Sequence, residues 1–325
     1  MLPIVRPKAL RPGDLVAVAA LSSGLETEVL EAYEHGVAEL ESLGFRVRPA
    51  PLVDVEKSWW WAAARPAEVA REINDLFRDP EVRAIWALTG GRFTLSYLDA
   101  LDYDAIAANP KLLIGMSDIA ATLLAIHSKT GLVTIHGENF LEGVGDWQAM
   151  SEPDRTRQID IYRRVLTSAE PAGRLPAFST WETWRPGRVE GRLLGGLLHR
   201  LVRIQATPWA LAPERFDGAI LFLEDLNTQT INVWNDLQVL RHGGGFDRIA
   251  GLLIGPTETI QTAPYAPQSL REVVLDVVGD RDIPVMGNVS FGHAGPNLPL
   301  PLGIRAAMDA EALTLELLEG AVTEA

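Results

Sequence analysis

Short apolar runs alternate with helical patterns along the first half of the chain. Residues 15–20 (LVAVAA) are continuously apolar, and residues 26–44 then repeat apolar side chains at helical spacing. The first pattern predicts a buried strand and the second an amphipathic helix. The pair recurs along the chain, which predicts strands at 45–51, 82–90, 112–117 and 132–137, and helices at 66–77, 94–110 and 118–131.

This alternation predicts an α/β fold, because parallel strands need crossover connections and are covered by helices on both faces. We assign residues 1–165 to an N-terminal layered α/β domain with a largely parallel sheet. Residues 166–190 are rich in charge and proline and are interpreted as a linker or substrate loop. Residues 191–325 carry further strand and helix patterns, which indicate a C-terminal mixed α/β domain. The length of 325 residues also exceeds what one hydrophobic core usually serves.

Composition narrows the possible partners and chemistry. Lys and Arg number 29 against 43 Asp and Glu, so the formal net charge is −14, which repels nucleic acid and anionic lipid. No apolar run reaches membrane-spanning length and the N-terminus lacks a signal-peptide pattern, so we expect a soluble cytoplasmic protein. The chain has no cysteine, and its histidines show no metal-binding spacing. We therefore expect no disulfide, metal or cofactor.

The segment Gly115-Met116-Ser117-Asp118 lies where a predicted strand ends and a helix begins. A serine at such a turn is raised out of the sheet, beside the free N–H groups of the helix N-terminus, as a nucleophile with an oxyanion intermediate requires. Ser117 or Asp118 as a simple helix cap is the alternative.

A Gly90-Gly91 pair ends the predicted strand at 82–90. Glycines let backbone N–H groups approach a ligand closely, so this turn could supply a second oxyanion donor, although a Gly-Gly pair is more often only a turn.

Two further segments carry candidate acid-base residues. Glu224 and Asp225 end the apolar run 219–224, where α/β folds place ligands, and for Asp225 we favour helix capping. His293 lies in a loop dense in glycine and proline, which would hold a general base in place, although a solvent-facing histidine fits equally well. His136, at the end of the strand predicted at 132–137, is the rival base.

The segments GMSD, LEDLN and GNVSFGHAGPNLPLPLG, taken in this order, resemble the LD-carboxypeptidase family of serine peptidases. The resemblance covers nearly the whole chain. It implies Ser117 as nucleophile, His293 as general base and Glu224 as the carboxylate that orients the histidine. It also implies oxyanion donors from the backbone of Asp118 and the Gly90-Gly91 turn, and a homodimer.

The resemblance implies a serine carboxypeptidase that cleaves an amide-type bond near the free carboxylate end of a small peptide or peptidyl-nucleotide. Murein tetrapeptide carboxypeptidases of cell-wall recycling usually have an Arg-Gly-Gly-Tyr-Gly loop, where this chain has Thr89-Gly90-Gly91-Arg92-Phe93. Microcin C self-immunity proteins have a tryptophan-bearing loop, matched here by Trp181 and Trp184 as candidate substrate contacts. This match favours the microcin group.

Two other classes of protein stay open at this point. A relative that binds a peptide or nucleotide without turnover would also keep this fold, although all three triad positions are filled. A dinucleotide enzyme is the other α/β option, but no G-x-G-x-x-G follows the first predicted strand.

Overall fold

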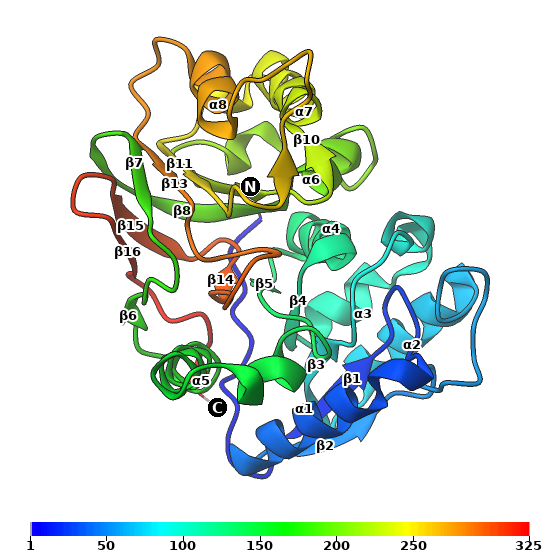
Figure 1. Cartoon of the computed structure of the whole chain (residues 1–325). Coiled ribbons are helices and arrows are strands. Elements are labelled where there is room, and N and C mark those ends of the chain that lie inside the picture. The colour runs from blue at the N-terminus through cyan, green and yellow to red at the C-terminus, as the bar shows by residue number, and fades with distance from the viewer. Residues whose placement is uncertain (1, 325) are drawn as a thin grey trace.

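The computed structural model describes residues 2–324 as two α/β domains (Figure 1). The first sheet has six strands in the order β14-β5-β4-β3-β1-β2. Its strands are β1 (Leu15–Ala19), β2 (Arg46–Pro49), β3 (Val82–Ala87), β4 (Leu112–Gly115), β5 (Ile135–His136) and β14 (Leu300–Pro301). All pairings in it are parallel except that between β14 and β5. The predicted layered N-terminal domain is therefore confirmed.

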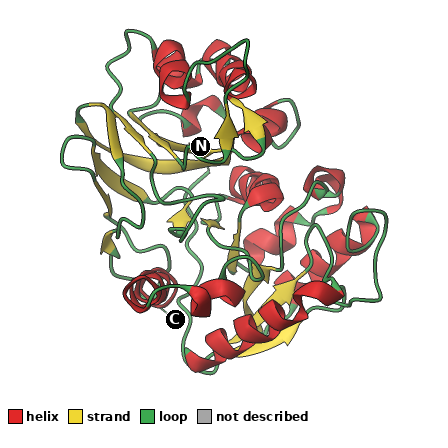
Figure 2. Cartoon of the chain, in the orientation of Figure 1, coloured by secondary structure: helices red, strands yellow, loops and turns green. Residues whose placement is uncertain are grey.

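Helices flank this sheet, as Figure 2 shows for the strands of the N-terminal half. They are α1 (Leu30–Ser42), α2 (Pro66–Arg78), α3 (Tyr103–Ala108), α4 (Ala120–Thr130) and α5 (Glu152–Thr167). The strands β1, β3 and β4 are buried on both faces almost throughout, which explains their continuous apolar sequences. The long helix predicted at 94–110 is wrong in extent, because only α3 and two short 3-10 turns form there.

The second sheet has eight strands in the order β6-β16-β15-β8-β9-β11-β13-β7. Its strands are β6 (Gly173–Arg174), β7 (Glu182–Arg185), β8 (Arg188–Leu197), β9 (Ile220–Glu224), β11 (Gly251–Ile254), β13 (Val285–Gly287), β15 (Arg305–Asp309) and β16 (Thr314–Leu317). Its centre, β8-β9-β11-β13, is parallel and its two edges are antiparallel. The predicted mixed C-terminal domain is confirmed.

The helices of the C-terminal domain are α6 (Leu198–Gln205), α7 (Thr230–His242) and α8 (Leu270–Val278). A separate pair, β10 (Thr228–Gln229) with β12 (Ile260–Gln261), lies outside both large sheets. None of the helices described within residues 2–324 combines the length and apolar composition needed to cross a membrane.

Two chain segments tie the domains together. Residues 166–190, predicted as a linker, contribute β6 and β7 to opposite edges of the second sheet. In the other direction β14 comes from the C-terminal half and pairs with β5, placing Leu300 opposite His136. The loop before β14, which holds His293, is thereby brought to the N-terminal sheet.

Gly195 gives a test of the packing between the central strands of the second sheet. It is buried on β8 with φ +151°, and a Cβ there would overlap the carbonyl oxygen of Phe222 on β9. We expect Gly195→Ala to lower the free energy of unfolding by about 3 kcal/mol or more, measured by urea denaturation. The control Gly218→Ala, at φ +65° with nothing within 4 Å of its Cβ, should cost about 1 kcal/mol. Equal losses in the two variants would contradict this account.

Candidate active site

Ser117 lies two residues beyond the end of β4 and opens the 3-10 turn Ser117–Ile119 that leads into α4. Its φ is +62°, in the left-handed region that few residues other than glycine adopt. Backbone strain of this kind persists where the surrounding fold enforces it, and it is concentrated at functional sites. The capping alternative is wrong, because the N-cap positions are Met116 for the turn and Ile119 for α4.

The Gly90-Gly91 turn lies directly against Ser117. A Cβ on Gly90 would lie 2.7 Å from Cβ and 2.8 Å from Oγ of Ser117, so only glycine permits this approach. A Cβ on Gly91, where φ is +150°, would overlap the hydroxyls of Ser22 and Ser23. Within residues 2–324 neither glycine N–H donates to a protein acceptor, so both are available to a ligand.

The Asp118 side chain joins three parts of the chain beside the serine. It is fully buried, and its carboxylate accepts hydrogen bonds from the hydroxyl of Ser22 (2.6 Å) and the N–H groups of Phe93 and Thr94. It also pairs with Arg200 on α6, with 2.8 Å between Oδ1 and Nη2. The carboxylate thus fixes the loop after Gly91 and one helix of the C-terminal domain to the residue that follows Ser117.

Glu224 and His293 form the second half of the candidate site. Glu224 ends β9, and its Oε2 lies 2.7 Å from Nδ1 of His293. Gly292, at φ +99°, is required beside this pair, since a Cβ there would lie 2.7 Å from Cγ of Glu224. Burial alone would lower the pKa of His293, but the charge and hydrogen bond of Glu224, aided by other nearby carboxylates, outweigh it and raise this pKa above 6.5.

The Asn297 side chain connects the two halves of the candidate site. Its Oδ1 accepts the N–H of Gly292, which precedes His293, at 3.0 Å. Its Nδ2 contacts Sδ of Met116, which precedes Ser117, at 2.7 Å. Among the described residues Nε2 of His293 has no hydrogen-bond partner, so the bond to the Ser117 hydroxyl is not formed in this conformation. Such bonds are often long in ligand-free enzymes and tighten with substrate.

The two other candidates named from sequence have different roles. His136 is fully buried between Phe222 and Phe291, and burial, then the charge of His293, lowers its pKa to about 3, which leaves it a neutral core residue. Asp225 does not cap α7, because the N-cap is Gln229 and the Asp225 carboxylate instead pairs with Nδ1 of His199 at 2.9 Å. The capping interpretation of Asp225 is therefore wrong.

A cavity of about 610 Å³ opens beside Ser117. Gly91 and Arg92 line it from the N-terminal domain, and α6, residues 225–228 after β9, and α7 line it from the C-terminal domain. Glu224 and His293 are not among the residues that line it. The candidate nucleophile Ser117, glycine N–H groups and a polar space for a ligand therefore meet between the two domains. The lining is mainly polar, as a site for a small charged peptide or nucleotide would be.

Comparison with known proteins gives the family. The model of the LD-carboxypeptidase N-terminal domain matches residues 16–137, and that of the C-terminal domain matches residues 190–308. The chain belongs to the LD-carboxypeptidase family. The family identified from the sequence segments is thereby confirmed, and so is a carboxypeptidase as the class of enzyme.

The relatives within this family fall into two groups. The microcin C7 self-immunity protein MccF of Escherichia coli is 29% identical over 95% of this chain and 94% of its own. A probable murein peptide carboxypeptidase of Bacillus subtilis is 28% identical over 98% and 96%. A solved structure of MccF in complex with aspartyl sulfamoyl adenosine superposes with a TM-score of 0.88, at 26% identity, covering 98% of this chain and all of that one.

Trp181 and Trp184, the candidate substrate contacts, are buried in this LD-carboxypeptidase. Their exposed fractions are 4% and 5%. The indole of Trp181 donates to Ser290 Oγ at 2.8 Å, and that of Trp184 packs over Gly287 and donates to Glu182. Neither ring has an open face for stacking in this conformation. Their substrate contact stays a prediction that requires movement of the segment containing β7.

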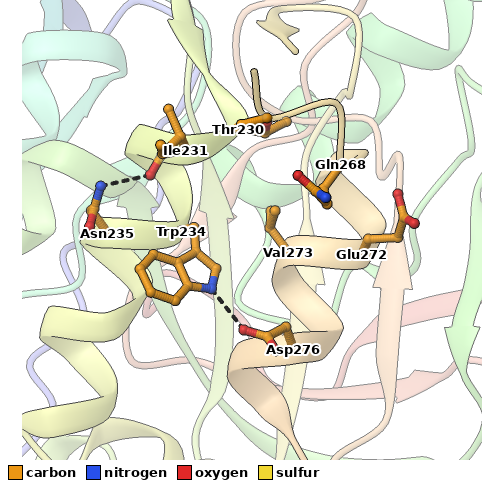
Figure 3. Close-up of a pocket in the computed structure, with 9 residues that line it drawn as sticks. Thr230, Ile231, Trp234, Asn235, Gln268, Glu272, Val273 and Asp276 are labelled. Atoms are coloured by element: carbon orange, nitrogen blue, oxygen red, sulfur yellow. Dashed lines mark hydrogen bonds between the residues drawn. The ribbon is translucent and has the colours of Figure 1, made fainter. Parts of the chain in front are cut away.

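A second cavity, of about 500 Å³, lies between α7 and α8 (Figure 3). Trp234 donates its indole N–H to Asp276 across the two helices at 2.7 Å. Asn235 lines both this cavity and the one beside Ser117, so the two adjoin along α7. The residues that line the second cavity include neither serine nor histidine, which leaves the first as the catalytic candidate.

Sequence reasoning missed three residues that hold the site together: Arg200, Asn297 and Glu138. Glu138 is buried, accepts the backbone N–H of Asn297 at 3.2 Å, and has its pKa raised to about 7 by burial. The side-chain partners of these residues lie far away in sequence, so no local pattern marks them. The charge of Arg200 within an otherwise apolar helix face was the one available signal.

The Asp118–Arg200 pair gives a prediction on stability. Arg200→Met leaves the Asp118 carboxylate buried without its cation, so we expect a loss of about 3 kcal/mol in the free energy of unfolding, measured with urea. The control Arg248→Met breaks an exposed pair with Asp217 and should cost at most about 1 kcal/mol. A loss no larger at Arg200 than at Arg248 would show that the buried pair contributes little.

Proposed function

We propose that this LD-carboxypeptidase is a serine-type enzyme in which Ser117, His293 and Glu224 act together. The observation that carries the proposal is the Glu224–His293 pair, which leaves Nε2 of the imidazole unpartnered, while Asn297 contacts both Gly292, next to His293, and Met116, next to Ser117. Glu224 accepts a hydrogen bond from Nδ1–H and so fixes the tautomer in which Nε2 can accept a proton.

In the proposed reaction Nε2 of His293 takes the proton of the Ser117 hydroxyl as its oxygen attacks the scissile carbonyl. The N–H groups of Gly90, Gly91 and Asp118 would stabilise the oxyanion. His293 then gives its proton to the leaving group, and an acyl-enzyme forms. Water, deprotonated by the same imidazole, releases the acyl group and restores the serine.

For the substrate we favour a peptidyl-nucleotide over a murein tetrapeptide. The similarity to MccF bound to aspartyl sulfamoyl adenosine supports this choice, as does the Thr89–Phe93 loop, which lacks the Arg, Tyr and last Gly usual in the murein enzymes. The alternative is supported by the nearly equal identity to the Bacillus subtilis murein peptide carboxypeptidase. A homodimer stays a prediction from the family resemblance, and a cytoplasmic location stays a prediction from the sequence pattern.

The nucleophile is tested with both substrates. We expect wild-type protein to cleave aspartyl sulfamoyl adenosine faster than it releases D-alanine from a murein tetrapeptide. Ser117→Ala should lower kcat on either by at least about 10⁴-fold with an unchanged thermal unfolding midpoint, whereas the exposed control Ser58→Ala keeps full activity. Full activity of Ser117→Ala would rule out the serine mechanism, and a preference for the tetrapeptide would assign the murein substrate.

The raised pKa of His293 predicts the pH profile. The base must be neutral, so kcat/KM should fall as the pH drops through the His293 pKa, and this acid limb should lie above pH 6.5. In Glu224→Gln burial is no longer offset by the carboxylate, so the limb should move to lower pH while kcat falls by about 10² to 10⁴. If the acid side of the kcat/KM profile lies at the same pH in Glu224→Gln as in the wild type, Glu224 does not set the pKa of the general base.

A further inference from the structure

Three arginines converge on the cavity beside Ser117. Arg92 reaches it from the loop after β3, and Arg200 and Arg203 reach it from α6 of the other domain. Burial lowers the pKa of Arg200, and the positive charges of Arg203 and Arg92 lower it further against the opposing charge of Asp118. Arg203 and Arg92 are therefore each close enough to act on the charge of Arg200.

Only one of these three charges is neutralised by an ion pair. Arg200 is buried against Asp118, as described above. In the described part of the chain, residues 2–324, neither Arg92 nor Arg203 forms an ion pair or a side-chain hydrogen bond. Both side chains are exposed, so two guanidinium groups line a shared cavity without a protein partner, in a chain whose formal net charge is −14.

The other carboxylates of the cavity do not fill this role. Asp225 is engaged by His199 at 2.9 Å. Asp236 feels the charge of Arg203, but among the described residues the two groups are not within ion-pair distance. Leu197, on the same wall, offers no polar side chain. The positive charge is left open to an anionic ligand.

We propose that Arg92 and Arg203 bind the free carboxylate of the substrate and so determine which bond reaches Ser117. This inference rests on the proposed function, since a carboxypeptidase must hold a carboxylate near the scissile bond. The planar guanidinium matches a carboxylate with two parallel hydrogen bonds. Arg92 lies two residues after Gly90, which touches Ser117, and its carbonyl is held by the indole N–H of Trp61 at 3.3 Å.

The two arginines come from different domains, so one bound carboxylate would bridge them. It would also offset the positive charge that Arg92 and Arg203 place near Arg200. A phosphate or sulfamoyl group of a nucleotide could supply a similar anion. Substrates that keep this group and change only the carboxylate distinguish the two sources.

The test compares acid and amide forms of each substrate. The pairs are aspartyl and asparaginyl sulfamoyl adenosine, which differ on the acyl side of the scissile bond, and a murein tetrapeptide ending in D-alanine or D-alaninamide, which differ on the leaving side. Because one subsite lies on one side of the bond, we expect the wild type to prefer the acid form in one of the two pairs, by about 10- to 100-fold in kcat/KM. Arg203→Met and Arg92→Met should each lose most of this preference through KM, with kcat little changed.

The control is Arg71→Met, which removes an exposed arginine on α2 and should leave the preference intact. Arg203→Lys keeps the charge without the planar fork and should restore part of the affinity. Equal losses on acid and amide substrates in Arg203→Met and Arg92→Met would indicate a structural role and overturn the inference.

Calorimetric titration of the acid and amide substrates into the Ser117→Ala variant tests this inference independently of the proposed function. Adding Arg203→Met to this variant should weaken binding of the acid form by about 10- to 100-fold and leave the amide form unchanged. If the wild type cleaves neither substrate, the proposed function fails, but these titrations still show whether the arginines bind a carboxylate. If cleavage depends on Ser117 but the arginine variants keep the acid preference, the function stands and the subsite is overturned.

Discussion

The site depends on one buried carboxylate, that of Asp118. An unpaired charge in a protein interior is costly, so Asp118 is stable only while all its partners stay in place. Those partners are Ser22 after β1, Phe93 and Thr94 after β3, and Arg200 on α6. Three chain segments must therefore meet at the residue next to the nucleophile. This requirement explains how a strained serine backbone persists there, because the surrounding bonds over-determine its position.

Asn297 and Glu138 provide a second link between the domains. Asn297 contacts the residues that precede Ser117 and His293, and its own backbone N–H is held by the Glu138 carboxylate. Glu138 also receives the indole N–H of Trp147, so the loop of the base is anchored in the N-terminal core. Burial raises the pKa of Glu138 to about 7, so the folded protein holds this proton more tightly than the unfolded chain does. The resulting stabilisation is present at acid pH and is lost as the pH rises through about 7.

The strands and the three candidate catalytic residues could be predicted because their signals are local. β1, β3 and β4 are buried on both faces and are apolar throughout, and Ser117, Glu224 and His293 each lie at a strand end or in a stiff loop. For Asp118 only the role of its backbone N–H as an oxyanion donor was predicted, because the partners of its side chain are distant in sequence. Trp181 and Trp184 were predicted as substrate contacts from the family resemblance, but both are buried where β7 pairs with β13. Two strands so far apart in sequence pair without producing any pattern in the local sequence.

The division of the site between domains has a mechanical consequence. The proposed nucleophile Ser117, the Gly90-Gly91 turn and Arg92 belong to the N-terminal domain, whereas Glu224, His293 and Arg203 belong to the C-terminal half. His293 Nε2 is unpartnered in this conformation, so the proposed proton transfer requires an adjustment that brings it to the Ser117 hydroxyl. Any ligand that contacts both domains at once favours the arrangement in which they are closest. Substrate binding and alignment of the base are then one event, and a ligand that touches a single domain would occupy the cavity without completing the triad.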